Sequence, residues 1–344
     1  MINRISVKLF SAVIIALVAA VSTATASWAK PLEMRISVDT GPAHARNKAI
    51  QNFIAVLNDR AEGQLDVKLY GSAQLFKDRD VAKALRQGGI DMAAPGYWLL
   101  DGMVPEATAA MLPALYGYDV DTVINLLDET IAPWTNPKIE TQTNSHVLGD
   151  WLVLGGTSYF SVSKRMDTHE DIDGMKIRVP GGMLLTAQAQ ALGASPVLIP
   201  FSDLSLALSQ GTADGFISSA ESVVSAKLWD SGVKFEFNDN GFYAAYVPLI
   251  SNAFWDKLSP ELKEIVTGAW RDIIGDARIA ALASQDEARI TLAEHGIITV
   301  YPTPEAQAKW RAKMMEDQDG LVEKMKMDAD FIEVLNAAIE HLSD

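Results

Sequence analysis

Apolar and polar residues follow two different periods along the first third of the chain. Short segments with a period of two residues predict strands, and longer segments with apolar residues every three or four positions predict helices. In order, these patterns predict a strand at 34–38, a helix at 45–58, a strand at 65–69, a helix at 78–87 and a strand at 90–93. Strands that alternate with helices in this way are typical of a largely parallel sheet covered by helices.

A second unit of the same kind follows. It contains two predicted helices and a set of short strands, and it is followed by one more buried strand and a long helix. The predicted strands lie at 147–154, 159–163, 175–179, 196–199, 214–218 and 243–251, and the helices at 183–192, 202–210 and 260–294. The tail at 304–344 is also predicted to be helical.

The helix at 260–294 bears on the domain organisation. Ser259 is a favourable cap and Pro260 suits the first helical position. At 1.5 Å per residue the helix would be roughly 50 Å long, which is wider than one small domain. We therefore expect two α/β lobes with a cleft between them, crossing strands at the hinge and this helix spanning both. That architecture is typical of a ligand trap that closes about a hinge.

The first 29 residues have the three-part pattern of a secretory signal peptide. Arg4 and Lys8 precede an apolar run from 9 to 21, and small residues follow it. The run is shorter than the roughly 20 residues that a membrane-spanning helix needs. We expect cleavage after Ala26 or Ala29, a mature chain that begins near Ser27 or Lys30, and export to the periplasm.

Composition narrows the classes of function further. The chain has no cysteine, which excludes disulfides and thiolate metal sites. Acidic residues number 44 against 29 basic ones, for a net charge of −15, which argues against nucleic acid as a partner. In so acidic a chain, an anionic ligand needs a site where basic side chains lie close together. Each arginine is therefore a candidate for binding such a ligand.

Sequence signatures of catalysis are missing. The chain has no G-x-S-x-G, no phosphate-binding G-x-x-x-x-G-K, no G-x-G-x-x-G after a strand and no H-E-x-x-H. Its five histidines are scattered, with no pair at the spacing of metal ligands. We therefore expect no cofactor, no metal site and no enzyme, and an exported hydrolase is the weaker alternative.

The segment from 171 to 258 carries a series of motifs. It contains DIDGMKIRVP at 171–180, LGASP at 192–196, PFSDL at 200–204, ALSQGTADG at 207–215 and NAFWDKL at 252–258. In this order and spacing the chain resembles the DctP-type solute-binding proteins of TRAP transporters, and the resemblance extends over nearly all of the expected mature chain. It implies the periplasmic binding protein fold. We expect lobe I at 30–150 and about 219–255, and lobe II at 151–218. Part of 256–344 belongs to lobe II, and the C-terminal helices span both lobes.

The resemblance implies a receptor that binds a small carboxylate and delivers it to separate membrane permease subunits. Arg178 falls on the position of the family's carboxylate-binding arginine, and a planar guanidinium can pair with a carboxylate through two hydrogen bonds. Phe201 falls on the ring that packs against the ligand. We expect a monomer. A sensor module that presents its ligand to a membrane receptor would have the same fold, and the sequence leaves that alternative open.

Two departures from the family pattern bear on the ligand. Ser218 stands where many members have an asparagine, and Ser158 stands where sialate-binding members have a second arginine. With one strong positive charge, the sequence predicts a monocarboxylate whose remainder is apolar or modestly hydroxylated. The further candidates for ligand contact are the aromatic residues Tyr97, Trp98 and Tyr159, together with Asp78, His44 and Glu221.

Overall fold

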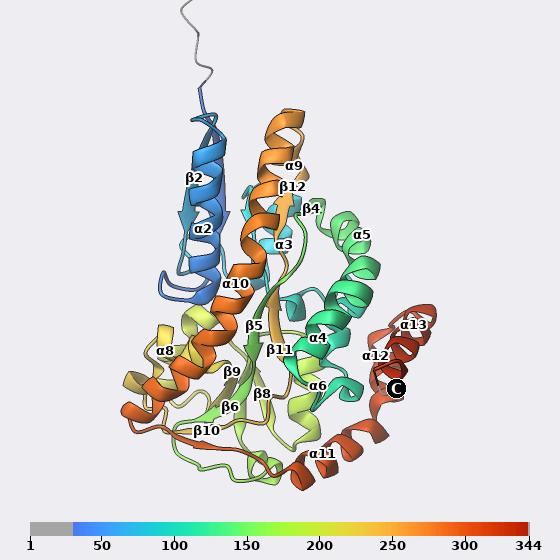
Figure 1. Ribbon diagram of the computed structural model, residues 1–344. Helices are drawn as coiled ribbons and strands as arrows, with labels where there is room; N and C mark the ends of the chain where they lie inside the picture. The colour runs from blue at the N-terminus through green and yellow to red at the C-terminus, as the bar shows by residue number, and fades with distance from the viewer. Residues whose placement is uncertain (1–29, 343–344) are drawn as a thin grey trace, which may run out of the picture.

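A computed structural model describes residues 30–342 and shows two lobes, each built on its own sheet (Figure 1). The expected signal peptide lies outside the described residues. The lobe I sheet has the order β2-β1-β3-β12-β4. Its strands are β1 (Leu32–Ser37), β2 (Leu65–Tyr70), β3 (Met92–Ala93), β4 (Ser145–Val147) and β12 (Leu249–Ser251). β1 pairs in parallel with β2 and β3, and β12 is antiparallel to both β3 and β4.

The lobe II sheet has six strands in the order β13-β10-β6-β9-β7-β8. β7 pairs in parallel with both β8 and β9, whereas β6 is antiparallel to β9 and to β10. The strands are β6 (Ser158–Ser161), β7 (Lys176–Val179), β8 (Ser195–Leu198), β9 (Gly215–Ser218), β10 (Phe235–Phe237) and β13 (Ile298–Val300).

Two antiparallel strands connect the lobes, β5 (Leu152–Gly156) and β11 (Tyr243–Tyr246). β5 leads from β4 in lobe I to β6 in lobe II, and β11 leads from β10 back to β12. Both strands are largely buried. The predicted crossing strands are therefore present, as a two-stranded ribbon between the sheets (Figure 1).

Helices cover both sheets. In lobe I they are α2 (Ala45–Arg60), α3 (Asp78–Arg86), η1 (Tyr97–Leu99), η2 (Pro105–Met111), η3 (Pro113–Leu115), α4 (Val120–Leu126), the π-helical η4 (Leu127–Ile131), α5 (Ala132–Thr143) and α9 (Asn252–Trp255). In lobe II they are η5 (His169–Ile172), α6 (Met183–Ala191), η6 (Phe201–Asp203), α7 (Leu204–Ser209), α8 (Ala220–Ser225) and η7 (Leu228–Ser231). Among residues 30–342, no helix is both long and apolar enough to cross a membrane.

The long helix α10 (Pro260–Glu294) has the predicted bounds and extends over both lobes (Figure 1). Ser259 caps it by accepting a hydrogen bond from the Leu262 backbone N–H at 3.2 Å. The helix packs on α2 of lobe I, then on β5, and then on α8 of lobe II. The tail forms three further helices, α11 (Pro304–Glu316), α12 (Gln318–Met325) and α13 (Ala329–Glu340).

Strand pairing corrects the expected lobe boundary. We expected about 219–255 to belong to lobe I, but β10 pairs with β6 and β13 in the lobe II sheet. The chain returns to lobe I only through β11, so residues 219–237 lie in lobe II. The segments at 147–154 and 243–251, each predicted as one strand, are each two strands. Pro248 lies between β11 and β12, and a proline has no backbone N–H to continue a ladder.

Candidate ligand-binding site

A cavity lies between the lobes, where both sheets meet the crossing strands. Lobe I, lobe II and the crossing ribbon each contribute to its lining. The lining residues are Asp39, Thr40, His44, Asp78, Arg79, Trp98 and Leu99 from lobe I; Arg178, Pro180, Pro200, Phe201, Ile217, Ser218, Ser219 and Ser222 from lobe II; and Leu154, Thr157, Phe242, Ala244 and Tyr246 from the ribbon and its flanks.

Arg178 lies on β7 in the lobe II wall of this cavity, and its side chain is 2% exposed. Its Nε donates to the Ile199 carbonyl at 2.7 Å and its Nη1 to the Ile217 carbonyl at 3.4 Å. Nη2 has no hydrogen-bond partner among residues 30–342, and no carboxylate there forms an ion pair with Arg178. Burial lowers the pKa of Arg178 to about 10, against the opposing charge of Asp39. The guanidinium is therefore held in place with part of its donor capacity unused.

Phe201 lies beside this guanidinium, and Trp98 lines the lobe I side of the cavity. The Cζ atom of Arg178 lies 6.0 Å from the centre of the Phe201 ring, within the range of a cation–π contact. The Trp98 indole is 8% exposed, and its Nε1 is buried without a hydrogen-bond partner in the described part of the chain. A side chain at position 96 would place its Cβ 2.2 Å from the Trp98 ring, so Gly96 makes room for this indole.

The lobe I wall carries a second buried arginine with a different environment. Arg46 on α2 is 0% exposed and forms ion pairs with Asp39 and Asp78. Its Nε also donates to the Thr40 hydroxyl at 3.2 Å, and its Nη1 donates to the Ala94 carbonyl at 3.0 Å. Burial disfavours the Arg46 charge, but the charges of Asp78 and Asp39 outweigh it and raise the pKa of Arg46.

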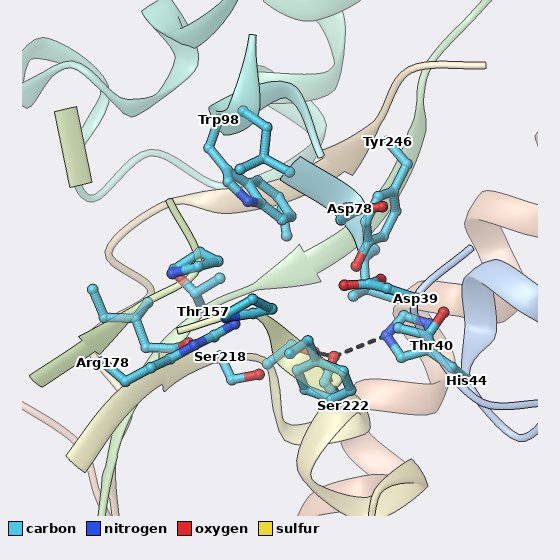
Figure 2. A pocket seen from close by; sticks show the side chains of 18 of the residues that line it. Asp39, Thr40, His44, Asp78, Trp98, Thr157, Arg178, Ser218, Ser222 and Tyr246 are labelled. Atoms are coloured by element: carbon cyan, nitrogen blue, oxygen red, sulfur yellow. Dashed lines mark hydrogen bonds between the residues drawn. The ribbon is translucent and has the colours of Figure 1, made fainter. Parts of the chain in front are cut away.

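Two carboxylates share this one guanidinium. Burial, together with the charge of Asp39, raises the pKa of Asp78 to about 7 against the opposing charge of Arg46. Asp39 accepts from Arg46 through Oδ1, and its Oδ2 has no hydrogen-bond partner within residues 30–342. Figure 2 shows Asp39 and Arg178 on opposite sides of the cavity.

Hydrogen bonds between the lobes close the cavity near α2. His44, the N-terminal cap of α2, contacts Ser222 of lobe II with 2.9 Å between Nε2 and Oγ (Figure 2). Its Nδ1 accepts from the Arg46 backbone N–H, so the proton of the neutral ring is on Nε2. Burial and the charge of Arg46 hold the pKa of His44 well below its usual value.

Glu221 joins the same contact between the lobes. It lies on α8, and its Oε1 accepts from the Ala45 backbone N–H at the start of α2, at 2.8 Å. Its Oε2 is 3.4 Å from Nε2 of His44. Burial raises the pKa of Glu221 to about 7.

Six of the ten residues predicted to contact the ligand line the cavity: Arg178, Phe201, Ser218, Trp98, Asp78 and His44. Glu221 lies just behind His44 and Ser222. The remaining three do not line the cavity.

Tyr97, Tyr159 and Ser158 are buried elsewhere. Tyr97 donates its hydroxyl to the Tyr243 carbonyl at 3.0 Å and stacks on Trp151, so it is part of the core. Tyr159 is a buried residue of β6. The Ser158 hydroxyl donates to Oε1 of Glu236 at 2.8 Å, inside lobe II. The ligand hypothesis therefore loses its argument from Ser158.

Several lining residues were missed by the sequence analysis, although the sequence carries signals for them. Ala244 and Tyr246 alternate along the crossing strand β11, Phe242 directly precedes it at the same spacing, and one face of such a strand meets the cleft. Asp39 and Thr40 lie just beyond β1, separated from it by Val38, and ligands of open α/β sheets bind beyond the carboxyl ends of the strands. Among residues 30–342, no cluster of three or more histidine and acidic side chains is arranged to hold a metal ion.

Two α/β lobes enclose a cavity, and an incompletely bonded guanidinium lies in its wall. This arrangement is typical of two-lobe solute receptors. The chain belongs to family 7 of the bacterial extracellular solute-binding proteins, the DctP family, whose model matches residues 36–324. This confirms the predicted family and the fold class.

Relatives of this chain are also periplasmic binding proteins. The chain is 26% identical over 286 residues to the C4-dicarboxylate-binding periplasmic protein DctP of Shewanella loihica, covering 83% of each chain. It is 24% identical to the sialic acid-binding periplasmic protein SiaP of Vibrio cholerae, covering 86% of this chain and 90% of that one.

Among solved structures, the sugar acid binding protein DctPAm of Advenella mimigardefordensis, in complex with galactonate, superposes with a TM-score of 0.84 at 23% identity, covering 90% of this chain and 99% of that one. A TRAP periplasmic solute binding protein of Sulfurospirillum deleyianum, with bound succinate, gives 0.83 at 24% identity, covering 90% and 100%.

Proposed function

We propose that this protein is the periplasmic receptor of a TRAP transporter, which binds a small organic acid by its carboxylate and delivers it to membrane permease subunits. Family membership and relatives that bind C4-dicarboxylates or sialic acid support this role. We also propose that the protein releases its ligand unchanged, because its relatives are binding proteins. Recovery of the bound acid without chemical change after long incubation tests that part.

The observation that carries the proposal is the incomplete bonding of Arg178. A buried charge without a counter-ion is costly, by several kcal/mol. Arg178 is 2% exposed, and its Nη2 has no hydrogen-bond partner in the described part of the chain. A ligand carboxylate at Nη2 would supply the missing counter-ion and a charge-assisted hydrogen bond worth about 1.5–3 kcal/mol.

The size of the cavity limits the ligand. Its volume is about 60 Å³. This favours a compact acid over an extended sugar acid.

The charges of the opposite wall favour a monocarboxylate. A second carboxylate on the ligand would approach Asp39 and Asp78, whose charges are already shared by a single arginine. Like charges brought together in a buried site repel each other strongly. The earlier prediction of a monocarboxylate thus rests on this wall and no longer on Ser158.

The receptor role is tested by thermal unfolding with a panel of organic acids. A ligand at 100 times its dissociation constant stabilises a protein by about 2.7 kcal/mol. The panel includes succinate, galactonate, a uronate, an aromatic monocarboxylate, short monocarboxylates and amino acids. We expect stabilisation by at least one acid and none by the matching primary amides. The absence of stabilisation by every acid would contradict the proposal.

Export is tested separately. Intact-mass measurement on a periplasmic extract should give a chain that begins near Ser27 or Lys30. Recovery of the full-length chain in the membrane fraction would contradict export with cleavage.

A further inference from the structure

We propose that the ligand is a zwitterion, whose carboxylate binds Arg178 and whose ammonium group binds the opposite wall at Asp39 and Asp78. This inference rests on the proposed function and names the class of acid that the site takes. It is carried by the charges around the cavity, by an unused carboxylate oxygen and by the aromatic lining.

The first observation is the imbalance of buried charge. Two buried guanidinium groups, Arg46 and Arg178, lie at or just behind the cavity wall. Three buried carboxyl groups lie there too, on Asp39, Asp78 and Glu221, and the exposed Arg79 also lines the cavity. A ligand that brings only a carboxylate adds a negative charge close to Asp39, and close to Asp78 and Glu221 when these are ionised. A ligand that also brings an ammonium group adds no net charge, so its burial is far less costly.

The second observation is the unused acceptor on Asp39. Its side chain is about nine-tenths buried, with 6% of the residue exposed, and it lines the cavity. Oδ1 is engaged by Arg46, whereas Oδ2 has no hydrogen-bond partner among residues 30–342. Across the cavity, Nη2 of Arg178 is an unused donor. Asp39 and Arg178 therefore line opposite sides of the same cavity, one with an unused acceptor and the other with an unused donor (Figure 2).

The third observation is the aromatic lining next to the acidic wall. The Trp98 ring lies 5.6 Å from the Tyr246 ring and 6.2 Å from the Phe242 ring, and all three residues line the cavity. Aromatic faces attract ammonium groups, and burial strengthens that attraction. Apolar acids would gain from the same rings, but they would leave Oδ2 of Asp39 unsatisfied, which disfavours them.

Proton release on binding gives the proposal a second signature. Burial raises the pKa of Asp78 to about 7, so this group is partly protonated at neutral pH. An ammonium group beside it would favour the ionised carboxylate and release the proton. The affinity for a zwitterion should therefore increase from pH 6 to pH 8, whereas the affinity for the hydroxy analogue, which has no ammonium group, should not.

Calorimetric titration with matched acids of three to five carbons tests the inference. At each length the set contains the amino acid, its hydroxy analogue, the unsubstituted monocarboxylate and the dicarboxylate, with the amine at the 2-position or at the far end. We expect at least one amino acid to bind about tenfold more tightly than its hydroxy analogue, with the predicted increase between pH 6 and pH 8. Asp39→Asn should reduce that preference to threefold or less, while Asp256→Asn, at an exposed position, should leave it unchanged.

The outcomes separate the two proposals. If the hydroxy, unsubstituted or dicarboxylic acids bind as tightly as the amino acids, the zwitterion is excluded and the receptor role stands. If none of these acids and no acid of the wider panel binds, the receptor role fails together with this inference. Because the comparison of acids uses the wild-type protein, it decides the question even where Asp39→Asn impairs folding.

Discussion

Arg46 and Arg178 are both buried arginines beside one cavity, yet their surroundings differ. Arg46 has two carboxylate partners and further acceptors on Thr40 and Ala94. Arg178 has two backbone carbonyls and no carboxylate within residues 30–342. Their pKa values move in opposite directions, upward for Arg46 and down to about 10 for Arg178. Burial alone therefore does not distinguish the two arginines, whereas the missing counter-ion of Arg178 does, and that difference is the basis for proposing Arg178 as the ligand contact.

The largest expected effect is the loss of Arg46. Arg46→Met leaves Asp39 and Asp78 buried without their shared cation, and removal of one partner from a buried ion pair costs about 3–5 kcal/mol. Urea unfolding of the ligand-free protein measures it. Arg178→Met is the matched control, and it should change the free energy of unfolding by less than about 1 kcal/mol, because it removes an unpaired buried charge. Equal losses in both variants would show that the two arginines play the same structural role.

The next effect concerns ligand affinity. Arg178→Lys retains the charge but loses the planar pair of donors, and each charge-assisted hydrogen bond contributes about 1.5–3 kcal/mol. We expect affinity for the acid to fall by about 10- to 100-fold, measured by calorimetry, with the circular dichroism spectrum unchanged. An affinity close to that of the wild type would remove Arg178 from the binding site.

The third effect is on the pH dependence of stability. Burial raises the pKa of Glu221 to about 7, from an ordinary value of 4.5. The folded chain then binds more protons than the unfolded chain between these two values, so stability is highest below about pH 4.5 and decreases as the pH rises through 7. The contribution is on the order of 3 kcal/mol.

Glu221→Gln isolates this contribution. It keeps the oxygen that accepts from Ala45 but does not titrate. We expect the ligand-free wild type to lose more stability between pH 5 and pH 8 than Glu221→Gln does, and Glu287→Gln, at an exposed position, to behave like the wild type. Identical pH profiles for all three would show that Glu221 titrates normally in the folded protein.

The smallest expected effect is at the rim of the cleft. Lys77 of lobe I and Asp203 of lobe II form an ion pair at 2.6 Å, with side chains 39% and 43% exposed. Exposed ion pairs contribute about 0–1 kcal/mol and are screened by salt. Lys77→Ala should weaken ligand binding less than fivefold, and the difference should vanish at 0.5 M salt. A larger, salt-independent loss would mean that this pair controls closure.

The sequence predicted the elements that carry strong local signals. The bounds of α10 agree with its cap at Ser259 and with its long apolar stripe. Arg178 was predicted as the ligand contact because its motif is specific for one family, and the structure places it in the cavity wall. Such features depend on neighbours along the chain or on a shared motif, so a sequence alone reveals them.

Features that depend on residues distant in the sequence could not be predicted from the sequence alone. Asp39, Asp78 and Arg46 come from three separate segments, and no apolar or polar pattern along the chain predicts that they form ion pairs. Ser158 occupies a position where sialate-binding members of the family have a ligand-contacting arginine, but its hydroxyl donates a hydrogen bond to Glu236. Glu236 lies on β10, a strand that the sequence analysis did not predict. β10 is three residues long, too short for a period of two to be recognised.

Strand β12 ties the folding of lobe I to the later part of the chain. It lies between β3 and β4, although it follows them in the sequence by about a hundred residues or more. A growing chain that has not reached residue 251 leaves both strands with an unpaired edge, which is a site for mispairing and aggregation. Pairing over such long separations is slow. We therefore expect that lobe I does not fold independently, and that a fragment ending at residue 150 aggregates instead of forming half a receptor.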